Sequence, residues 1–166
     1  MTEQLKKAFD EVDITYKDVI VIANDITDRY FKEIDEIIKS LYDSVESLTD
    51  EDIRQSVLKI SLKAYTIGEV KERASFKAEL SETIKKVAYS EKYNLSEGTV
   101  AARENASIIG TSDTIITSAI YEYVACTFKT KLDEMHRCVD SLKSILISRQ
   151  AEAKNLRQLD GVGDIQ

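Results

Sequence analysis

Apolar residues recur every three or four positions along most of the chain, which is the spacing of one buried face on an α-helix. Up to residue 30 the intervals alternate between four and three, as in a coiled-coil seam, at Leu5, Phe9, Val12, Tyr16, Val19, Ala23, Ile26 and Tyr30. The pattern then shifts by one residue and continues at Ile34, Ile38, Leu41, Val45 and Leu48. This shift indicates a stutter in one helix or a break near Asn24 and Asp25, and we expect one long helix over residues 1–48.

A second helical segment is predicted over residues 50–93. Thr49 is expected to cap it, because three acidic residues, 50–52, would then lie at the positively polarised helix N-terminus. Gly68 interrupts the segment and would allow a kink there. The core candidates beyond this glycine are Phe76, Leu80, Ile84, Val87 and Ala88. A loop over residues 94–98 and a short helix over residues 99–108 follow.

The C-terminal pattern predicts a long helix over residues 112–159 and a disordered tail over residues 160–166. The helix carries a regular seam, which we expect to join copies of the chain: Phe128, Leu132, Met135, Val139, Leu142, Leu146 and Arg149. Arg149 lies on the seam itself. It would either pair with an acid of the N-terminal segment and set the register, or be an ordinary charged flank.

Composition agrees with an all-α fold, because 166 residues contain no proline and only five glycines, which leaves little material for the turns of a sheet. We expect a single all-helical domain over residues 1–159, built as an elongated bundle. Two long coiled-coil-like helices, one at each end of the chain, would be joined by shorter helices. Helices of about 46 residues would span roughly 70 Å at about 1.5 Å per residue, so their apolar seams predict a homo-oligomer.

The net charge of −7 conceals an uneven distribution. Residues 1–52 contain 6 basic and 15 acidic residues, whereas residues 53–93 contain 9 basic and 5 acidic residues. An acidic N-terminal arm is therefore followed by a basic middle segment. Aromatic residues are interleaved with these bases, at Tyr65, Phe76, Tyr89 and Tyr93.

A basic surface with stacking aromatic side chains is typical of proteins that hold single-stranded nucleic acid without sequence preference. The candidate phosphate-binding residues in the middle segment are Lys59, Lys63, Lys71, Arg73, Lys77, Lys85, Lys86 and Lys92. The competing interpretation is a solvated helix face whose aromatic residues belong to the core.

The residues of a catalytic site are missing from the pattern. His136 is the only histidine, and neither Cys126 nor Cys138 has the spacing of a catalytic dyad or a zinc site with it. We expect both cysteines to be reduced and buried. No phosphate-binding glycine motif precedes a helix. The sequence therefore predicts no enzyme activity, no cofactor and no bound metal. It also shows neither a membrane span nor a signal peptide, which predicts a cytoplasmic protein.

The order of elements over residues 70–158 resembles a known family. A lysine- and alanine-rich helix leads through the loop to the segment TVAARENA at residues 99–106, and a long helix ends in LDEMHRCVDSLKSILISRQAE at residues 132–152. This order is similar to that of the small helical recombination mediators of bacteriophages, the UvsY family. The acidic arm lies outside the resemblance.

The resemblance implies a non-catalytic, ring-forming phage protein that acts in the bacterial host cell. Such a protein binds single-stranded DNA and helps to load a RecA-like recombinase onto DNA that is coated by single-strand-binding protein. The basic positions that match are Lys71, Arg73, Lys77, Lys85, Lys86, Lys92 and Arg103.

Two functions therefore remain open. The first is an oligomeric accessory protein for recombination or repair that binds single-stranded DNA. The second is a coiled-coil adaptor, an assembly factor or an inhibitor of a host defence protein, without nucleic-acid binding, because acidic helices can occupy a basic groove of a partner.

Overall fold

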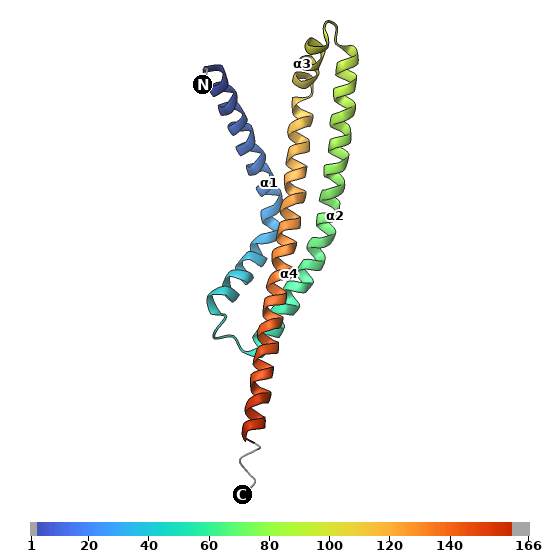
Figure 1. The fold of residues 1–166 in the computed structure, drawn as a ribbon. Coiled ribbons are helices and arrows are strands. Elements are labelled where there is room, and N and C mark those ends of the chain that lie inside the picture. Colours follow the sequence, from blue (N-terminus) through green and yellow to red (C-terminus); the bar gives the residue numbers. More distant parts are fainter. Residues whose placement is uncertain (1–2, 161–166) are drawn as a thin grey trace. The chain divides into compact units, whose positions relative to one another are not determined.

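The computed structural model describes the backbone of residues 3–160 and the side chains of residues 15–156. This part of the chain forms four α-helices and no strand, which confirms the predicted all-α class (Figure 1). The helices are α1 (Glu3–Ser44), α2 (Asp50–Leu95), α3 (Val100–Gly110) and α4 (Ser112–Asp160). The tail predicted over residues 160–166 lies outside the described residues, apart from Asp160, which ends α4.

The helix ends differ from the expected ones by a few residues. α1 continues through Asn24 and Asp25 and ends at Ser44, where the Ser44 and Ser47 hydroxyls donate to main-chain carbonyls of the preceding turn. α2 is continuous through Gly68, so residues 50–93 belong to a third long helix of 46 residues rather than to shorter pieces. Nothing lies within 4 Å of the position that a Gly68 Cβ would take, so packing does not require the glycine.

The cap at the start of α2 is confirmed. The Thr49 hydroxyl accepts the main-chain N–H of Asp52 at 3.2 Å, and the Asp52 carboxylate accepts the main-chain N–H of Thr49 at 3.0 Å. This reciprocal pair is a capping box. The hydrogen bonds from the Thr49 hydroxyl and main chain hold the pKa of Asp52 below its ordinary value.

The chain divides into two compact units, and helices α1, α2 and α4 each contribute to both. Unit 1 contains the chain up to Tyr30 and Gly68–Thr130, and unit 2 contains Phe31–Ile67 and the chain from Lys131 onward. Each unit is described by itself below.

Unit 2 has a core of large apolar side chains from three helices. The members that are at most 8 % exposed are Phe31, Ile34, Leu41, Ile53, Ile60, Ala64, Ile67, Met135, Val139 and Leu142. Arg149 links α4 to the start of α2. Its guanidinium donates to the Leu48 carbonyl at 2.6 Å and lies 3.3 Å from the Asp50 carboxylate. Of the two interpretations left open for Arg149, pairing with an acid thus occurs, within the chain and with Asp50.

The seam that was expected to join copies of the chain is largely covered by the chain itself. Met135, Val139 and Leu142 are buried in unit 2, Phe128 is buried in unit 1, and Leu132, Leu146 and Arg149 are half-buried. The expectation that this seam needs a second copy is corrected accordingly, because helices of the same chain already exclude water from it.

Unit 1 is built differently. At one end, Val19, Ala23 and Thr27 of α1 are buried, and the rings of Tyr30 and Phe128 meet edge to face with centroids 5.4 Å apart. The remainder is a hairpin of α2 and α4, which run antiparallel side by side and are connected through α3 (Figure 1). We call residues 68–130 the hairpin.

Small and polar residues occupy the inside of the hairpin. Its side chains that are at most 9 % exposed between residues 74 and 118 are Ala74, Ser81, Ser107, Thr111 and Ser118. Three of the hydroxyls donate to the carbonyl four residues earlier in the chain, as Ser81 does to Lys77 at 2.5 Å. Among the described residues no buried side-chain nitrogen or oxygen lacks a partner. Small side chains allow two helices to approach closely.

The core predicted for this region is therefore wrong in most of its members. Phe76, Leu80, Ile84 and Val87 are 66 %, 48 %, 51 % and 52 % exposed, and Ala88 is half-buried. The spacing of large apolar residues identified one face of α2, but the partner helix packs against another face, on which the residues are small. Tyr16 of the predicted α1 seam is likewise exposed.

Candidate nucleic-acid interface

The far end of the hairpin is a turn that fixes the position of α3. Gly98 has φ 107°, a left-handed conformation that favours glycine. Thr99 follows in extended conformation and caps α3, since its hydroxyl accepts the main-chain N–H of Ala102 at 3.4 Å. Thr111 alone separates α3 from α4, and its hydroxyl donates to the Ser107 carbonyl at 2.8 Å.

A groove runs between the C-terminal part of α2 and the α3–α4 junction. Its volume is about 400 Å³ and it is lined by Lys85, Lys86, Tyr89, Ser90, Ile108, Thr111 and Ile115. We call it the lysine–tyrosine groove. Lysines lie on its α2 side, and isoleucines from α3 and α4 provide an apolar wall opposite them.

Glu82 partly neutralises the two lysines of this groove. Its carboxylate pairs with Lys85, lies 3.6 Å from Lys86 and accepts the Ser118 hydroxyl at 3.2 Å. The hydrogen bond from Lys85 holds the pKa of Glu82 below its ordinary value, although burial opposes this shift. Lys86 keeps the looser contact and its side chain is 73 % exposed, so its ammonium group is accessible to a ligand.

Aromatic and cationic side chains stack beside the groove. The rings of Tyr89 and Tyr93 are stacked with centroids 6.4 Å apart and an interplanar angle of 18°. The guanidinium of Arg103 lies 4.1 Å from the centroid of Tyr93 and donates to the Tyr93 carbonyl at 3.1 Å. The methylene groups of Lys92 lie against Gly110, where a Cβ would meet the Lys92 Cδ at 3.2 Å. Of the predicted basic residues, Arg103 thus contacts the tyrosine pair, and Lys85 and Lys86 line the groove together with Tyr89.

A second groove lies on another face of α2 in the hairpin. It has a volume of about 390 Å³ and is lined by Lys77, Leu80, Ser81, Ile84, Asp113, Thr114, Thr117 and Tyr121. We call it the aliphatic groove. The ammonium of Lys77 lies 5.5 Å from the centroid of the Tyr121 ring, a cation–π contact.

The structure divides the nine candidate phosphate-binding residues among several places. Lys85 and Lys86 line the lysine–tyrosine groove, Arg103 lies against Tyr93, and Lys92 lies against Gly110, whereas Lys77 lines the aliphatic groove. Lys71 pairs with Glu72 at 2.7 Å, and Arg73 is exposed on the hairpin. Lys59 and Lys63 belong to unit 2, where Lys63 pairs with Glu33 at 2.5 Å.

Several groove residues were not anticipated from the sequence. Ile108 and Ile115 form the apolar wall, Tyr121 contacts Lys77, and Glu82 holds two lysines. The sequence contained one signal that could have found them, the series of small residues Ala74, Ala78, Ser81 and Ala88. This series identifies the face of α2 that lies inside the hairpin, and so indicates which faces point outward.

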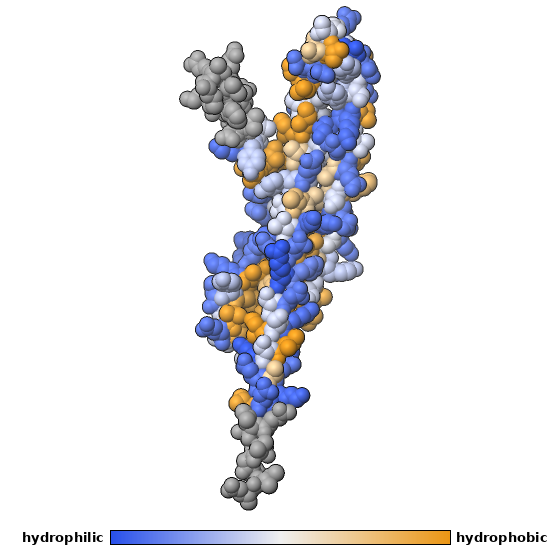
Figure 2. Space-filling model, viewed as in Figure 1, coloured by the Kyte–Doolittle hydropathy of each residue, from blue (hydrophilic) through white to orange (hydrophobic). Residues whose placement is uncertain are grey.

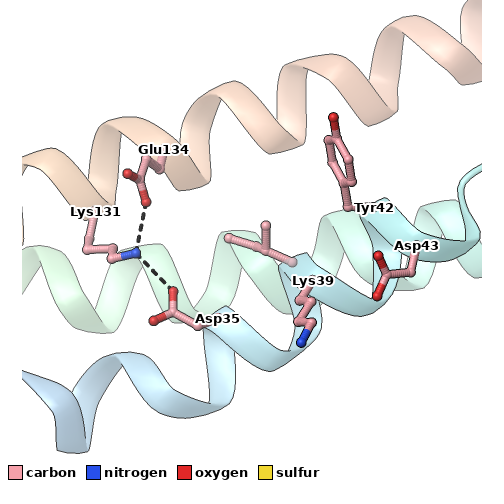
Figure 3. A pocket seen from close by; sticks show the side chains of 7 residues that line it. Asp35, Lys39, Tyr42, Asp43, Lys131 and Glu134 are labelled. Carbon is pink, nitrogen blue, oxygen red and sulfur yellow. Dashed lines mark hydrogen bonds and ion pairs between the residues drawn. The ribbon is translucent and has the colours of Figure 1, made fainter.

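Unit 2 has a hollow of its own, of about 360 Å³, lined by Asp35, Ile38, Lys39, Tyr42, Asp43, Lys131 and Glu134 (Figure 3). Lys131 lies between Asp35 and Glu134, at 3.0 Å from each carboxylate. Burial lowers the pKa of Lys131, but its hydrogen bonds to Glu134 and Asp35 outweigh burial and raise the pKa above the ordinary value. The ion pair with Asp35 joins α4 to α1, whereas the one with Glu134 lies within α4.

The histidine, the cysteines and the acidic residues are the candidate metal ligands of the chain. The described residues contain no group of three or more histidine, cysteine or acidic side chains that could hold a metal ion. His136 is exposed, Cys138 is half-buried, and burial raises the pKa of its thiol. Cys126 is exposed, contrary to expectation, because the buried face of α4 passes through Val124 and Phe128 instead.

No helix within the described range has an apolar stretch of the length needed to cross a membrane. No protein-family model, curated protein or solved structure matches the chain. The geometry of the hairpin therefore provides the argument for function.

Proposed function

We propose that this chain is a non-enzymatic accessory protein that binds single-stranded DNA through the lysine–tyrosine groove. The observation that carries the proposal is the conjunction, in one groove, of the exposed Lys86 ammonium, the Tyr89 ring and an apolar wall, with Tyr93 stacked on Tyr89. Single-stranded nucleic acid requires these two kinds of contact, since its phosphates need cations and its unpaired bases need flat or apolar surfaces.

Each group has a role in this proposal. Lys86 receives a phosphate, because it is the more exposed of the two lysines and has the looser contact with Glu82. Tyr89 offers its ring to a base, next to Ile108 and Ile115 across the groove. Arg103 holds Tyr93 in place from the other side of the tyrosine pair.

The resemblance to UvsY-like mediators extends the proposal to recombination or repair. In that role the chain would act as a homo-oligomer in the cytoplasm of a bacterial host and assist a RecA-like recombinase on DNA coated by single-strand-binding protein. The groove lies within residues 70–158, the part of the chain to which the resemblance applies.

The test is a titration of fluorescently labelled oligothymidine with the full chain, followed by anisotropy at several salt concentrations. Binding should weaken linearly on logarithmic axes, with a slope of about −0.7 for each phosphate contacted. Lys86→Gln should reduce the slope by about 0.7. Tyr89→Ala should cost about 1–3 kcal/mol of binding free energy for one stacked base.

The matched control is Lys32→Gln, which removes an exposed lysine of α1 in unit 2 and should leave the affinity unchanged. Absence of binding at low salt contradicts the proposal. So does an equal loss of affinity in Lys32→Gln and Lys86→Gln, because the attraction would then be a general charge effect rather than a property of the groove.

A second candidate, a protein adaptor without nucleic-acid binding, is favoured by a different observation. Phe76, Leu80, Ile84 and Val87 form an exposed apolar stripe on α2, and a patch of this kind is typical of a protein-interaction surface. A pull-down with the full chain that recovers one host protein and no nucleic acid would favour this function.

A further inference from the structure

Helix α2 has two different faces within the hairpin. One face carries Ala74 and Ser81 and is buried. The other carries Phe76, Leu80, Ile84 and Val87, whose intervals of four, four and three residues place them on one side of the helix. All four are between 48 % and 66 % exposed, and we call them the apolar stripe. Figure 2 shows hydrophobic residues gathered on the surface of the hairpin.

The apolar stripe borders a hollow that could receive side chains from outside. Leu80 and Ile84 belong both to the stripe and to the aliphatic groove, of about 390 Å³. A ridge of side chains next to a groove is the arrangement by which one helix packs against another. The stripe and the groove together can therefore accept a helix that carries a similar ridge.

The charges that flank the stripe indicate which helix this is. Arg73 and Glu91 lie in line with the stripe, seven residues before Leu80 and seven residues after Ile84, whereas Glu79 and Lys86 lie on one flank, and all four are exposed. If the same helix of a second copy runs antiparallel, with the two-fold axis level with residue 82, Arg73 lies opposite Glu91 of that copy. Glu79 then lies opposite Lys86 of that copy, and the two-fold symmetry forms each of these pairs of opposite charges twice.

The apolar residues match in the same register. Phe76 lies opposite Val87 of the second copy, and Leu80 lies opposite its Ile84, so the stripe covers itself. A parallel arrangement in register would instead place Arg73 against Arg73 and Glu91 against Glu91, because residues in line with the stripe face their own copies. Like charges directly opposite one another are unfavourable. The charge pattern thus distinguishes the antiparallel arrangement from the parallel one.

We propose that the apolar stripe is the interface of an antiparallel homodimer, in which Phe76, Leu80, Ile84 and Val87 pack against the same residues of a second copy. The interface has the self-complementarity that a two-fold symmetric pair requires. It goes beyond the proposed DNA binding, because the apolar stripe shares no residue with the lysine–tyrosine groove and needs no nucleic acid; of the charges that pair across it, Lys86 alone also lines that groove. It also differs from the seam of α4 that the sequence favoured.

The first test is the molar mass of the full chain by sedimentation equilibrium without nucleic acid. The wild-type chain should reach a dimer with rising concentration, and the double variant Leu80→Glu with Ile84→Glu should dissociate at least ten-fold more readily. Both sites are about half exposed, so circular dichroism should show unchanged helix content. The control is Ile109→Glu, at a 75 % exposed site on α3 outside the stripe, and it should associate as the wild type does.

The second test reports the direction of the helices. In a background in which both cysteines are replaced by serine, Thr83→Cys should form an intermolecular disulfide, because the two copies of residue 83 lie next to the axis. Glu91→Cys should not, because its copies are separated by 18 residues of helix rise, or about 27 Å. Glu79→Lys should weaken the dimer, and adding Lys86→Glu should restore it.

Each outcome of these tests either supports or overturns the antiparallel dimer. Dimerisation that is lost in Leu80→Glu with Ile84→Glu, together with cross-linking at residue 83 alone, supports the proposal. A monomer at all concentrations overturns it, as a stripe covered by the chain itself or by a different protein would produce. Association that the double variant leaves intact overturns it too, and so does cross-linking at both positions, which indicates a parallel pair.

Discussion

Unit 2 and the hairpin of unit 1 share helices α2 and α4, but between residues 74 and 118 the hairpin buries the opposite kind of side chain. Unit 2 encloses large apolar residues such as Ile34, Ile60 and Met135, each 0 % exposed. The hairpin of unit 1 encloses Ser107, Thr111 and Ser118, each at most 2 % exposed, and leaves large apolar residues on its surface. The difference shows that one helix can bury large apolar side chains in one part of its length and expose them in another.

The chemistry of the two interiors explains this division. Burial of a large aliphatic side chain contributes about 1.5–3 kcal/mol, whereas a buried serine contributes little beyond its hydrogen bond. Unit 2 therefore has the stronger hydrophobic core. The hairpin depends on close helix packing and on polar contacts, such as the one between Ser118 and Glu82, and its outer faces carry the two grooves and the apolar stripe.

The largest expected effect tests this contrast with a matched pair of isoleucines on α2. Ile60→Ala, in the core of unit 2, should lower the free energy of unfolding by about 2–5 kcal/mol because it leaves a cavity. Ile84→Ala, at a 51 % exposed site of the hairpin, should change it by about 0.5 kcal/mol or less. Urea unfolding followed by circular dichroism, at a concentration too low for self-association, measures both. Similar losses of unfolding free energy in the two variants would contradict the difference between unit 2 and the hairpin.

A smaller effect should follow from enlarging a residue inside the hairpin. Ser107→Leu should lower the free energy of unfolding by about 1–3 kcal/mol. Ser107 of α3 is fully buried, so the helices packed around it must move apart to admit the larger side chain. The same unfolding experiment measures the change. Ser90→Leu, at an exposed position of the same hairpin, is the control and should be nearly neutral. A Ser107→Leu variant as stable as wild type would show that small residues are not required there.

The smallest effect concerns a helix end rather than a face. Thr49→Ala should reduce stability by about 1 kcal/mol at neutral pH, because it removes the hydroxyl that caps α2. The pKa of Asp52 is lowered in the folded chain, so its contribution is fully present above the unfolded pKa, near 3.8, and is lost as the pH falls through the folded value. The difference in unfolding free energy between wild type and variant should therefore become smaller in acid, while the part that comes from the hydroxyl and the Asp52 main-chain N–H remains. A difference that is independent of pH would exclude the carboxylate from the cap.

Local features of the fold could be read from the sequence because they depend on neighbouring residues. The cap at Thr49, the loop before Thr99 and the alternation of helices and breaks follow from hydrogen bonding within a few residues. The candidate site was predicted only in part. Lys85, Lys86 and Lys92 share the end of the hairpin, but Lys59 and Lys63 proved to belong to unit 2, because linear proximity on a long helix says little about which unit encloses it.

By itself the sequence determined that this protein is helical, since periodic apolar residues without proline favour long helices over any other element. It also determined which residues share a face, because helical geometry is fixed. Only the tertiary structure decided which face is inside. On α2 the large residues Phe76, Leu80, Ile84 and Val87 point outward because α4 packs on a neighbouring face of small residues. That choice depends on the fit between two distant segments, which no local pattern contains.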